Sequence, residues 1–207
     1  ENLRLITQLR VDLRHLVYLE SSRSADNNWE RLFLFSPEVV YHSDAWSQRA
    51  RFRVSANYID YDFTDAAPAS RVFRKYSIDD SLKINFTQRW GLKVNYLMLL
   101  EDRGNLDWAR FVQDLSDEYT THDGTILLAY RIGGLEYAAG WGLYHRRGSH
   151  TDFPDENVQS SGPAVEIYGS GPFGFEVELS ASYRHITETG RESYNQTLID
   201  LTLFKLL

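Results

Sequence analysis

Two aspartates separated by one residue stand in the first half of the chain. Asp60 and Asp62 share one face if this segment is a strand, because successive side chains of a strand point to opposite faces. Paired carboxylates deprotonate water when a suitable partner, often histidine, completes the site. No aspartate stands two residues before a histidine anywhere in the sequence. We therefore interpret the pair as part of a solvated rim.

A serine beside a histidine is a second candidate, because a base next to a hydroxyl can create a nucleophile. His42 and Ser43 fall in a short connection, where serine and aspartate favour a hydrogen-bonded turn. Carboxylates in loops can also hold calcium, although neither acidic group here has the EF-hand spacing. The two groups are Asp114, Asp117, Glu118 and Asp123, then Asp152, Asp155 and Glu156. We leave metal binding open and expect no cofactor.

Composition narrows the class of protein. The 207 residues carry a formal net charge of −7, which argues against a nucleic-acid partner, since those are held by clustered Lys and Arg. The absence of cysteine excludes disulfides, thiolate zinc sites and thiol nucleophiles. No apolar run approaches the roughly 20 residues that a membrane-spanning helix needs. Aromatic residues make up 14% of the chain, a level typical of β-rich proteins.

Alternation with a period of two predicts strands along the whole chain. Residues 3–13 place Leu and Val on one parity and Arg, Gln and Asp on the other, which a helix with 3.6 residues per turn cannot do. The pattern recurs at 51–58, 82–87, 92–98, 135–143 and 173–183, and weaker segments fit near 31–42, 125–132, 163–169 and 195–206. We predict an all-β fold of about ten strands, in one domain that spans 1–207.

The predicted connections alternate in length. Short turns fall at 42–46, 88–91, 132–134 and 169–173, and long polar connections at 22–29, 64–75, 101–124, 146–160 and 186–194. All turns of one kind then lie at one end of the strands. This pattern predicts an up-and-down antiparallel transmembrane β-barrel with short periplasmic turns, long extracellular loops and both termini on the periplasmic side.

Periodicity alone does not say which face points outward. A soluble lipocalin-like barrel puts its apolar face inward around a ligand. Here the polar face carries mid-strand charges such as Arg51, Lys83 and Glu176, and burying each in a soluble core would cost several kcal/mol. The apolar face also ends in aromatics such as Trp46 and Trp90, as expected for interfacial girdles. We expect the apolar face to contact lipid, and we keep the soluble barrel as an alternative.

With these features the chain resembles bacterial outer-membrane β-barrel proteins over essentially its whole length. Its final segment, QTLIDLTLFKLL, places Ile199, Leu201 and Leu203 on one face, similar to the terminal strand that the barrel-assembly machinery reads. Such signals usually end in Phe or Trp, whereas Phe204 here is followed by three more residues. The resemblance implies an outer-membrane location and contact with outer-membrane lipid. The chain is either a complete small barrel or the barrel part of a longer protein.

Two groups of outer-membrane enzymes share this architecture. Omptins, which are ten-stranded proteases, carry an Asp-x-Asp pair and an Asp-x-His pair near the extracellular rim. The sequence has the first pair at Asp60 and Asp62 and lacks the second. Lipid A deacylases use a Ser near a His on the lipid face, whereas His42 and Ser43 fall at the predicted periplasmic end. We therefore expect a protein that is not an enzyme, with an omptin-like or lipase-like activity as an alternative.

Charges on the predicted interior face divide between the two halves of the chain. The expected network consists of Arg10, Arg14, Arg51, Arg53, Lys83, Lys93, Glu136, Glu166, Glu176 and Glu178. Opposed walls of opposite sign either pair across the interior as a plug or create a transverse field in a narrow pore. We favour the plug, with Arg51 and Arg53 facing Glu176 and Glu178, because long side chains fill the narrow interior of a ten-stranded barrel.

The third long connection is predicted to contain an amphipathic helical turn. Apolar residues recur at helical spacing within 105–118, and they are Trp108, Phe111, Val112 and Leu115. Such a stripe should cover the barrel mouth or contact a partner protein. The sequence as a whole predicts a structural or partner-binding outer-membrane barrel, or a narrow channel. A partner protein would bind through the extracellular loops or the periplasmic end.

Overall fold

Ten antiparallel strands make up nearly all of the computed structural model, which describes residues 2–20, 26–63, 70–107, 110, 112–170 and 175–205. The strands are β1 (Asn2–Leu16), β2 (Asn28–His42), β3 (Trp46–Tyr61), β4 (Arg71–Asn85), β5 (Trp90–Asp107), β6 (Val112–Ile132), β7 (Leu135–His150), β8 (Glu156–Ser170), β9 (Phe175–Glu188) and β10 (Tyr194–Lys205). Within these residues no helix is long and apolar enough to cross a membrane.

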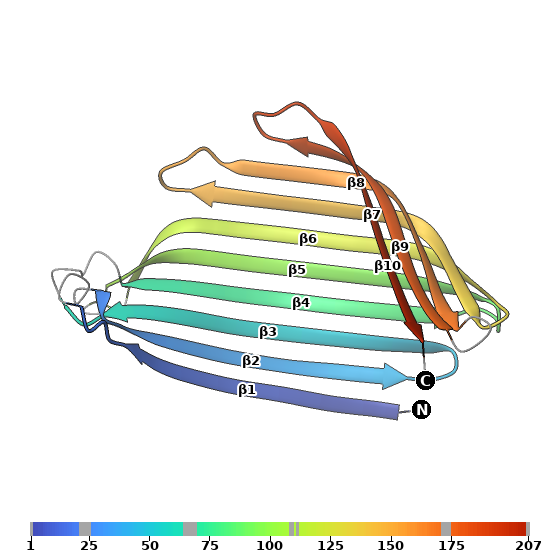
Figure 1. The fold of residues 1–207 in the computed structure, drawn as a ribbon, viewed down its shortest axis with the longest axis horizontal. Coiled ribbons are helices and arrows are strands. Elements are labelled where there is room, and N and C mark those ends of the chain that lie inside the picture. Colours follow the sequence, from blue (N-terminus) through green and yellow to red (C-terminus); the bar gives the residue numbers. More distant parts are fainter. Residues whose placement is uncertain are drawn as a thin grey trace.

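The strands form one up-and-down sheet in the order β1 to β10, with each strand paired to its neighbours in sequence. The predicted all-β class, strand number and antiparallel order are confirmed. The sheet is open, because the described ladders pair β1 only with β2 and β10 only with β9. Both chain ends lie at the end of the sheet that carries the short turns (Figure 1).

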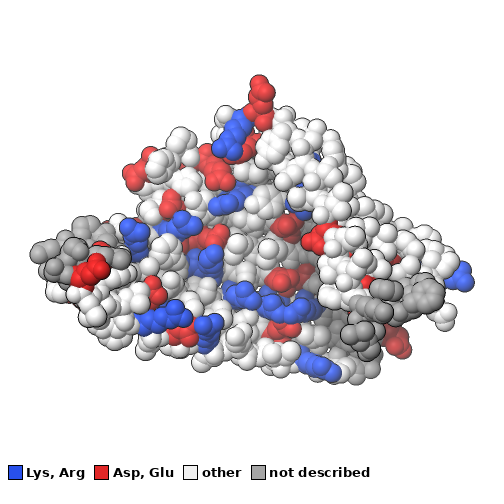
Figure 2. Space-filling view, viewed as in Figure 1, with Lys and Arg blue, Asp and Glu red and all other residues white. Residues whose placement is uncertain are grey.

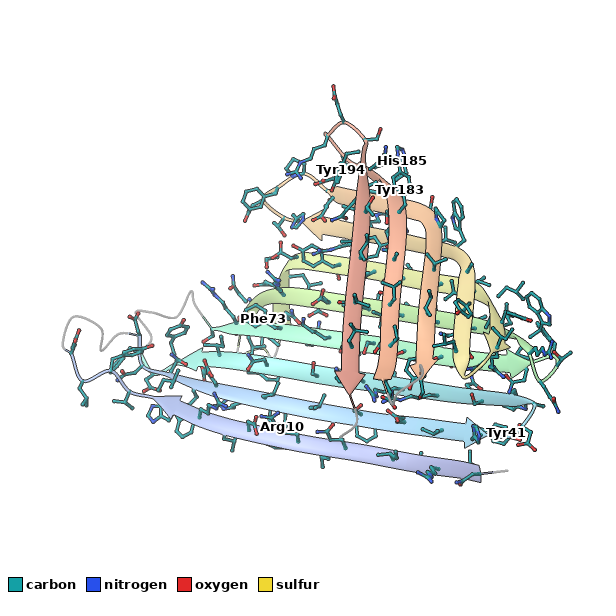
Figure 3. The ribbon with its side chains drawn as sticks, turned by 45° about the vertical axis from the view of Figure 1, so that its right-hand side comes forward. Arg10, Tyr41, Phe73, Tyr183, His185 and Tyr194 are labelled. Carbon is teal, nitrogen blue, oxygen red and sulfur yellow. The ribbon has the colours of Figure 1, made fainter. Side chains whose placement is uncertain are left out.

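The sheet curls, so that β9 and β10 cross in front of the middle strands and β7 and β8 bend along their length (Figure 3). Close backbone contact at the bend requires glycine. A Cβ added to Gly162 in β8 would collide with the carbonyl oxygen of Tyr183 in β9. This curvature gives the sheet one concave and one convex face.

The strands at the end with the longer connections extend much further than the sequence predicted. The expected connection at 101–124 consists mostly of β5 and β6, which are separated only by residues 108–111. Polar pairs hold this extension together: Arg74 on β4 donates to Asp102 at 2.8 Å, and the guanidinium of Arg146 lies 4.5 Å from the ring of Tyr119. The extended strands follow from these cross-strand contacts, which composition does not reveal.

The predicted amphipathic turn is wrong for the described part of 105–118. Residues 105–107 belong to β5 and residues 112–118 to β6, and the register shifts at Gly104. A Cβ on Gly104 would collide with the backbone of Asp114, so the irregularity fits a residue without a side chain. Trp108 and Phe111 lie outside the described residues. Val112 and Leu115 are strand residues, 46% and 41% exposed.

Ion pairs between distant strands identify the concave face. Lys83 on β4 reaches Glu136 on β7, and Lys93 on β5 reaches Glu166 on β8. Strands three places apart lie about 14 Å from each other along a flat sheet, so these pairs form only where the sheet curves toward them. The charged parity therefore lines the concave face, as does a small core of Leu127, Ala129 and Ala138.

The opposite parity forms an exposed apolar convex face on all ten strands. At its two edges Leu9 on β1 is 75% exposed and Leu201 on β10 is 58% exposed, and in the middle Trp141 on β7 is 52% exposed. Monomeric soluble proteins rarely expose contiguous apolar patches larger than a few hundred Å². Most charged residues of the strands thus lie inside the curve, and most large apolar residues lie outside it.

Candidate functional site: the charged concave face

Glu136 is the hub of the concave face. Its side chain is 10% exposed and accepts hydrogen bonds from Lys83 Nζ at 2.6 Å and Arg131 Nε at 2.7 Å. Lys93 Nζ lies 3.7 Å from the other carboxylate oxygen. Three strands on one side of β7 thus each direct a cation at one carboxylate, which is itself nearly buried while the cations are partly exposed.

The network continues on both sides of this hub. Lys93 also forms an ion pair with Glu166 on β8, and Arg131 donates to Asn85 Oδ1 at 2.6 Å. The connected groups therefore run from β4 to β8 across the inside of the curve. Figure 2 shows charges of both signs interspersed over the middle of the molecule, without a wall of one sign. These ion pairs link β4 to β8, and their side chains fill part of the space inside the curve.

A second cluster surrounds Glu38 on β2. This residue is 8% exposed and accepts from Arg49 Nε at 3.0 Å and from Arg51 Nε at 2.6 Å. Both arginines come from β3, the next strand, and Glu38 pairs directly with Arg51 in the register. The basic residues of β3 are thus partly neutralised by their own neighbour in the sheet.

The structure brings together four residues of the predicted network and separates the others. Lys83, Lys93, Glu136 and Glu166 form the cluster just described. Arg10 pairs with Asp12 of its own strand at 2.5 Å. Arg51 binds Glu38 rather than Glu176 or Glu178. Among the described ion pairs, none includes the remaining members, which are Arg14, Arg53, Glu176 and Glu178.

Sequence reasoning missed Glu38 and Arg131. The apolar alternation of β2 is interrupted at Ser36 and Pro37, so Glu38 was assigned to neither face. Arg131 falls in the weak predicted segment 125–132, whose alternation is too poor to assign its residues to a face. Pairing the sequence of β2 with that of β3 reveals Glu38, because it lies directly opposite Arg51. Opposite charges stabilise directly opposed positions of neighbouring strands.

The aspartates of the proposed rim have separate partners. Asp60 accepts from Ser70 at 3.1 Å and pairs with Arg31 at 3.4 Å, while Asp62 contacts His15 Nε2 at 2.8 Å. Ser43 is held in its turn, where its hydroxyl donates to the Trp46 carbonyl at 3.0 Å. Over the residues that the structure describes, no group of three or more His, Asp or Glu side chains could hold a metal ion.

One member of the acidic groups has a histidine partner. Asp117 Oδ1 lies 2.6 Å from His150 Nδ1, in the part of β6 and β7 beyond the apolar band. The hydrogen bond from His150 holds the pKa of Asp117 below its usual range. The pair therefore ties the projecting ends of β6 and β7 together above acidic pH.

Aromatic residues line both ends of the convex face. At the short-turn end, the rings of Tyr41 and Trp46 lie 4.2 Å apart, and those of Trp90 and Tyr130 lie 4.7 Å apart. At the other end, His15 stacks on Trp29 and further histidines continue the row on later strands. Trp and Tyr are enriched where a membrane protein meets the interface between lipid and water. Aromatic rings thus flank the apolar band at both of its ends.

Comparison with known proteins adds no family. No protein-family model matches the chain, and no curated protein matches it. The fold and the concave charge network are therefore the basis for a functional proposal.

Proposed function

We propose that β1 and β10 pair to close the sheet into a ten-stranded barrel of the bacterial outer membrane, and that the ion-paired concave face largely fills its lumen. The barrel acts as a structural or partner-binding protein. One observation carries the proposal: a single sheet that is apolar on its convex side across ten strands and ion-paired on its concave side across β4 to β8. Even-numbered antiparallel barrels with short turns at one end and polar interiors have this organisation.

Closure would remove the two unpaired edges. An open edge exposes backbone N–H and C=O groups and invites association with other chains, and in lipid each unpaired group costs several kcal/mol. β1 begins at the end of the sheet that carries the short turns, and β10 ends there (Figure 1). The two strands therefore run in opposite directions and would pair antiparallel, as all other neighbouring strands do. Their exposed apolar residues would then continue the convex band without a gap.

Closure can be tested by disulfide cross-linking, because the chain contains no cysteine of its own. One cysteine replaces Leu13 on β1 and a second replaces each position from 195 to 203 in turn. In lipid vesicles we expect one odd-numbered position, and weakly its odd-numbered neighbours, to form a disulfide within one chain, since odd positions of both strands share the convex face. Disulfides formed only between chains, or none at any position, would contradict closure.

Conductance tests whether the lumen is plugged. We expect wild-type protein in planar bilayers to be silent, because Lys83, Lys93 and Arg131 are paired with carboxylates. Replacing Glu136 and Glu166 by Gln leaves these cations unopposed, so we expect ion leakage with a preference for anions. A wild-type protein that already conducts would favour the narrow channel over the plug.

A further inference from the structure

A hollow of about 740 Å³ opens over β5 to β9, lined mainly by residues of the convex face. It includes Gly124, which lies directly between Tyr96 and Leu143 in the register. A Cβ added to Gly124 would meet nothing closer than 3.9 Å. The missing side chain therefore leaves room in the hollow, and a larger residue would fit there without moving the backbone.

The floor of the hollow is apolar and accessible. Val94, Ile126, Trp141 and Leu143 line it, and the last three are 55%, 52% and 58% exposed. They come from β5, β6 and β7 and continue the convex band. A surface of this kind accepts a hydrocarbon chain, because each buried methylene group contributes about 0.8 kcal/mol.

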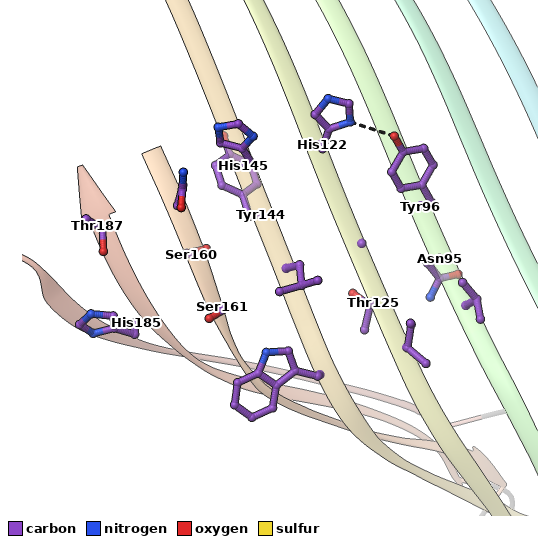
Figure 4. Close-up of a pocket in the computed structure, with 16 residues that line it drawn as sticks. Asn95, Tyr96, His122, Thr125, Tyr144, His145, Ser160, Ser161, His185 and Thr187 are labelled. Carbon is purple, nitrogen blue, oxygen red and sulfur yellow. Dashed lines mark hydrogen bonds between the residues drawn. The ribbon is translucent and has the colours of Figure 1, made fainter. Parts of the chain in front are cut away.

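The edge of the hollow toward the long connections is polar and contains two histidines, while a third, on β9, lies one step nearer the floor in register with Leu143. His122 and His145 are direct neighbours on β6 and β7, with ring centroids 6.4 Å apart, and His185 lies on β9 (Figure 4). Each imidazole contacts a neutral oxygen: Tyr96 Oη at 2.8 Å, Asn157 Oδ1 at 3.0 Å and Asn195 Oδ1 at 2.9 Å, respectively.

These histidines differ from two others in the molecule. His15 contacts Asp62 and His150 contacts Asp117, so each of those imidazoles already interacts with a carboxylate. No Asp or Glu is among the residues that line the hollow, although the chain as a whole has a formal net charge of −7. The hollow thus offers an anion hydroxyl and amide donors beside imidazole rings, with no carboxylate among the residues that line it.

We propose that this hollow binds one membrane glycerophospholipid, with an acyl chain on the apolar floor and its phosphate at His122 and His145. Phosphate oxygens accept several hydrogen bonds at once, and the Gln159, Ser161 and Thr187 side chains that also line the hollow supply further donors. The hollow and the lipid have the same polarity along their length. The apolar floor, which would hold the acyl chain, lies toward the middle of the band, and the polar edge, which would hold the phosphate, lies toward its border. This inference rests on the proposed membrane function.

The test compares two lipids that differ only in phosphate. Protein refolded in maltoside micelles is titrated with a phosphatidylglycerol and with the diacylglycerol that has the same chains, and bound lipid is counted by native mass spectrometry. We expect one phosphatidylglycerol per protein, bound at least tenfold more tightly than the diacylglycerol. Equal affinity for the two lipids, or no saturable binding of either, would overturn the proposal.

Variants assign the binding to the two parts of the hollow. Gly124→Leu should weaken both lipids by filling the floor, whereas His122→Leu with His145→Leu should remove only the preference for phosphate. His15→Leu, at the same end of the convex face but outside the hollow, is the matched control and should change neither. Unchanged binding in the first two variants, with folding verified by circular dichroism, would overturn the assignment.

Failure of the membrane function would give a different result. In that case, labels on the convex face would be shielded from lipid-soluble quenchers in vesicles, whatever the lipid affinity in micelles. A convex face that contacts lipid, without preference for the phosphate, would overturn only the phospholipid site.

Discussion

Neutralising Glu136 should destabilise the protein more than any other single charge change on the concave face. Glu136→Gln keeps the shape of the side chain and removes its charge. The carboxylate accepts two short hydrogen bonds from cations and has a third cation at 3.7 Å. Its side chain is 10% exposed, and those of Lys83, Arg131 and Lys93 are 36%, 29% and 22% exposed.

The expected magnitude follows from these contacts. Removing one partner of a buried ion pair costs about 3–5 kcal/mol, and a hydrogen bond to a charged group contributes about 1.5–3 kcal/mol. The partly exposed cations can turn toward water, and the amide of Gln still accepts one hydrogen bond. We therefore expect a loss of about 2–3 kcal/mol in the free energy of unfolding, below the full cost for a buried pair.

Urea unfolding in lipid vesicles, followed by the fluorescence of the five tryptophans, measures this loss. Glu178→Gln is the matched control, because Glu178 is an exposed residue of the same face and has no partner among the described ion pairs. It should change the free energy of unfolding by less than about 0.5 kcal/mol, as surface substitutions usually do. Equal effects of the two substitutions would refute the role of Glu136 as a hub.

Three further predictions concern the convex face and the projecting strands. Val94→Arg should cost about 2–4 kcal/mol of unfolding free energy in vesicles, whereas Asn95→Arg, which faces the concave side, should cost clearly less. Asp80 lies within the convex band, where Gln48 donates to it at 3.0 Å; replacing both by Leu should raise stability in vesicles by about 1–4 kcal/mol, and a loss of stability would contradict lipid contact there. The pKa of Asp117 is lowered in the folded state, so its contribution of about 1 kcal/mol is present above the unfolded value of about 3.9 and is lost as the pH falls through the folded value. The difference in unfolding free energy between wild type and Asp117→Asn should therefore be largest near neutral pH and vanish in strong acid; a difference that persists in acid would refute it.

The strands could be predicted from the sequence because their two faces have different chemistry. Leu92, Val94 and Tyr96 alternate with Lys93 and Asn95, and the structure places these three apolar residues on β5 with the parity of the convex face. Alternation reports the face of each residue directly, and Lys83 and Glu136, which it places on the polar face, share the concave face of the sheet. The two-residue alternation of side chains is a local property of a strand, and it does not depend on which strands are its neighbours.

Partners and strand ends could not be predicted in the same way. Lys83 and Glu136 are 53 residues apart, and they meet only because the sheet curls across three intervening connections. Polar residues on both faces also remove alternation in 101–124, where pairs such as Arg74 with Asp102 hold the strands together. The hollow at Gly124 needs five strands in register, and no single segment carries its signal.

Nitroxide labels along β5 test the central claim most directly, since the wild-type chain has no cysteine that would compete for the label. Labels at 94, 96 and 98 lie on the convex face, and labels at 95 and 97 lie on the concave face. In lipid vesicles we expect the even positions to be accessible to oxygen dissolved in the bilayer and shielded from a water-soluble relaxation agent, and the odd positions to be less accessible to oxygen. The reverse pattern, or even positions that respond mainly to the water-soluble agent, would contradict a barrel that presents its apolar convex face to lipid.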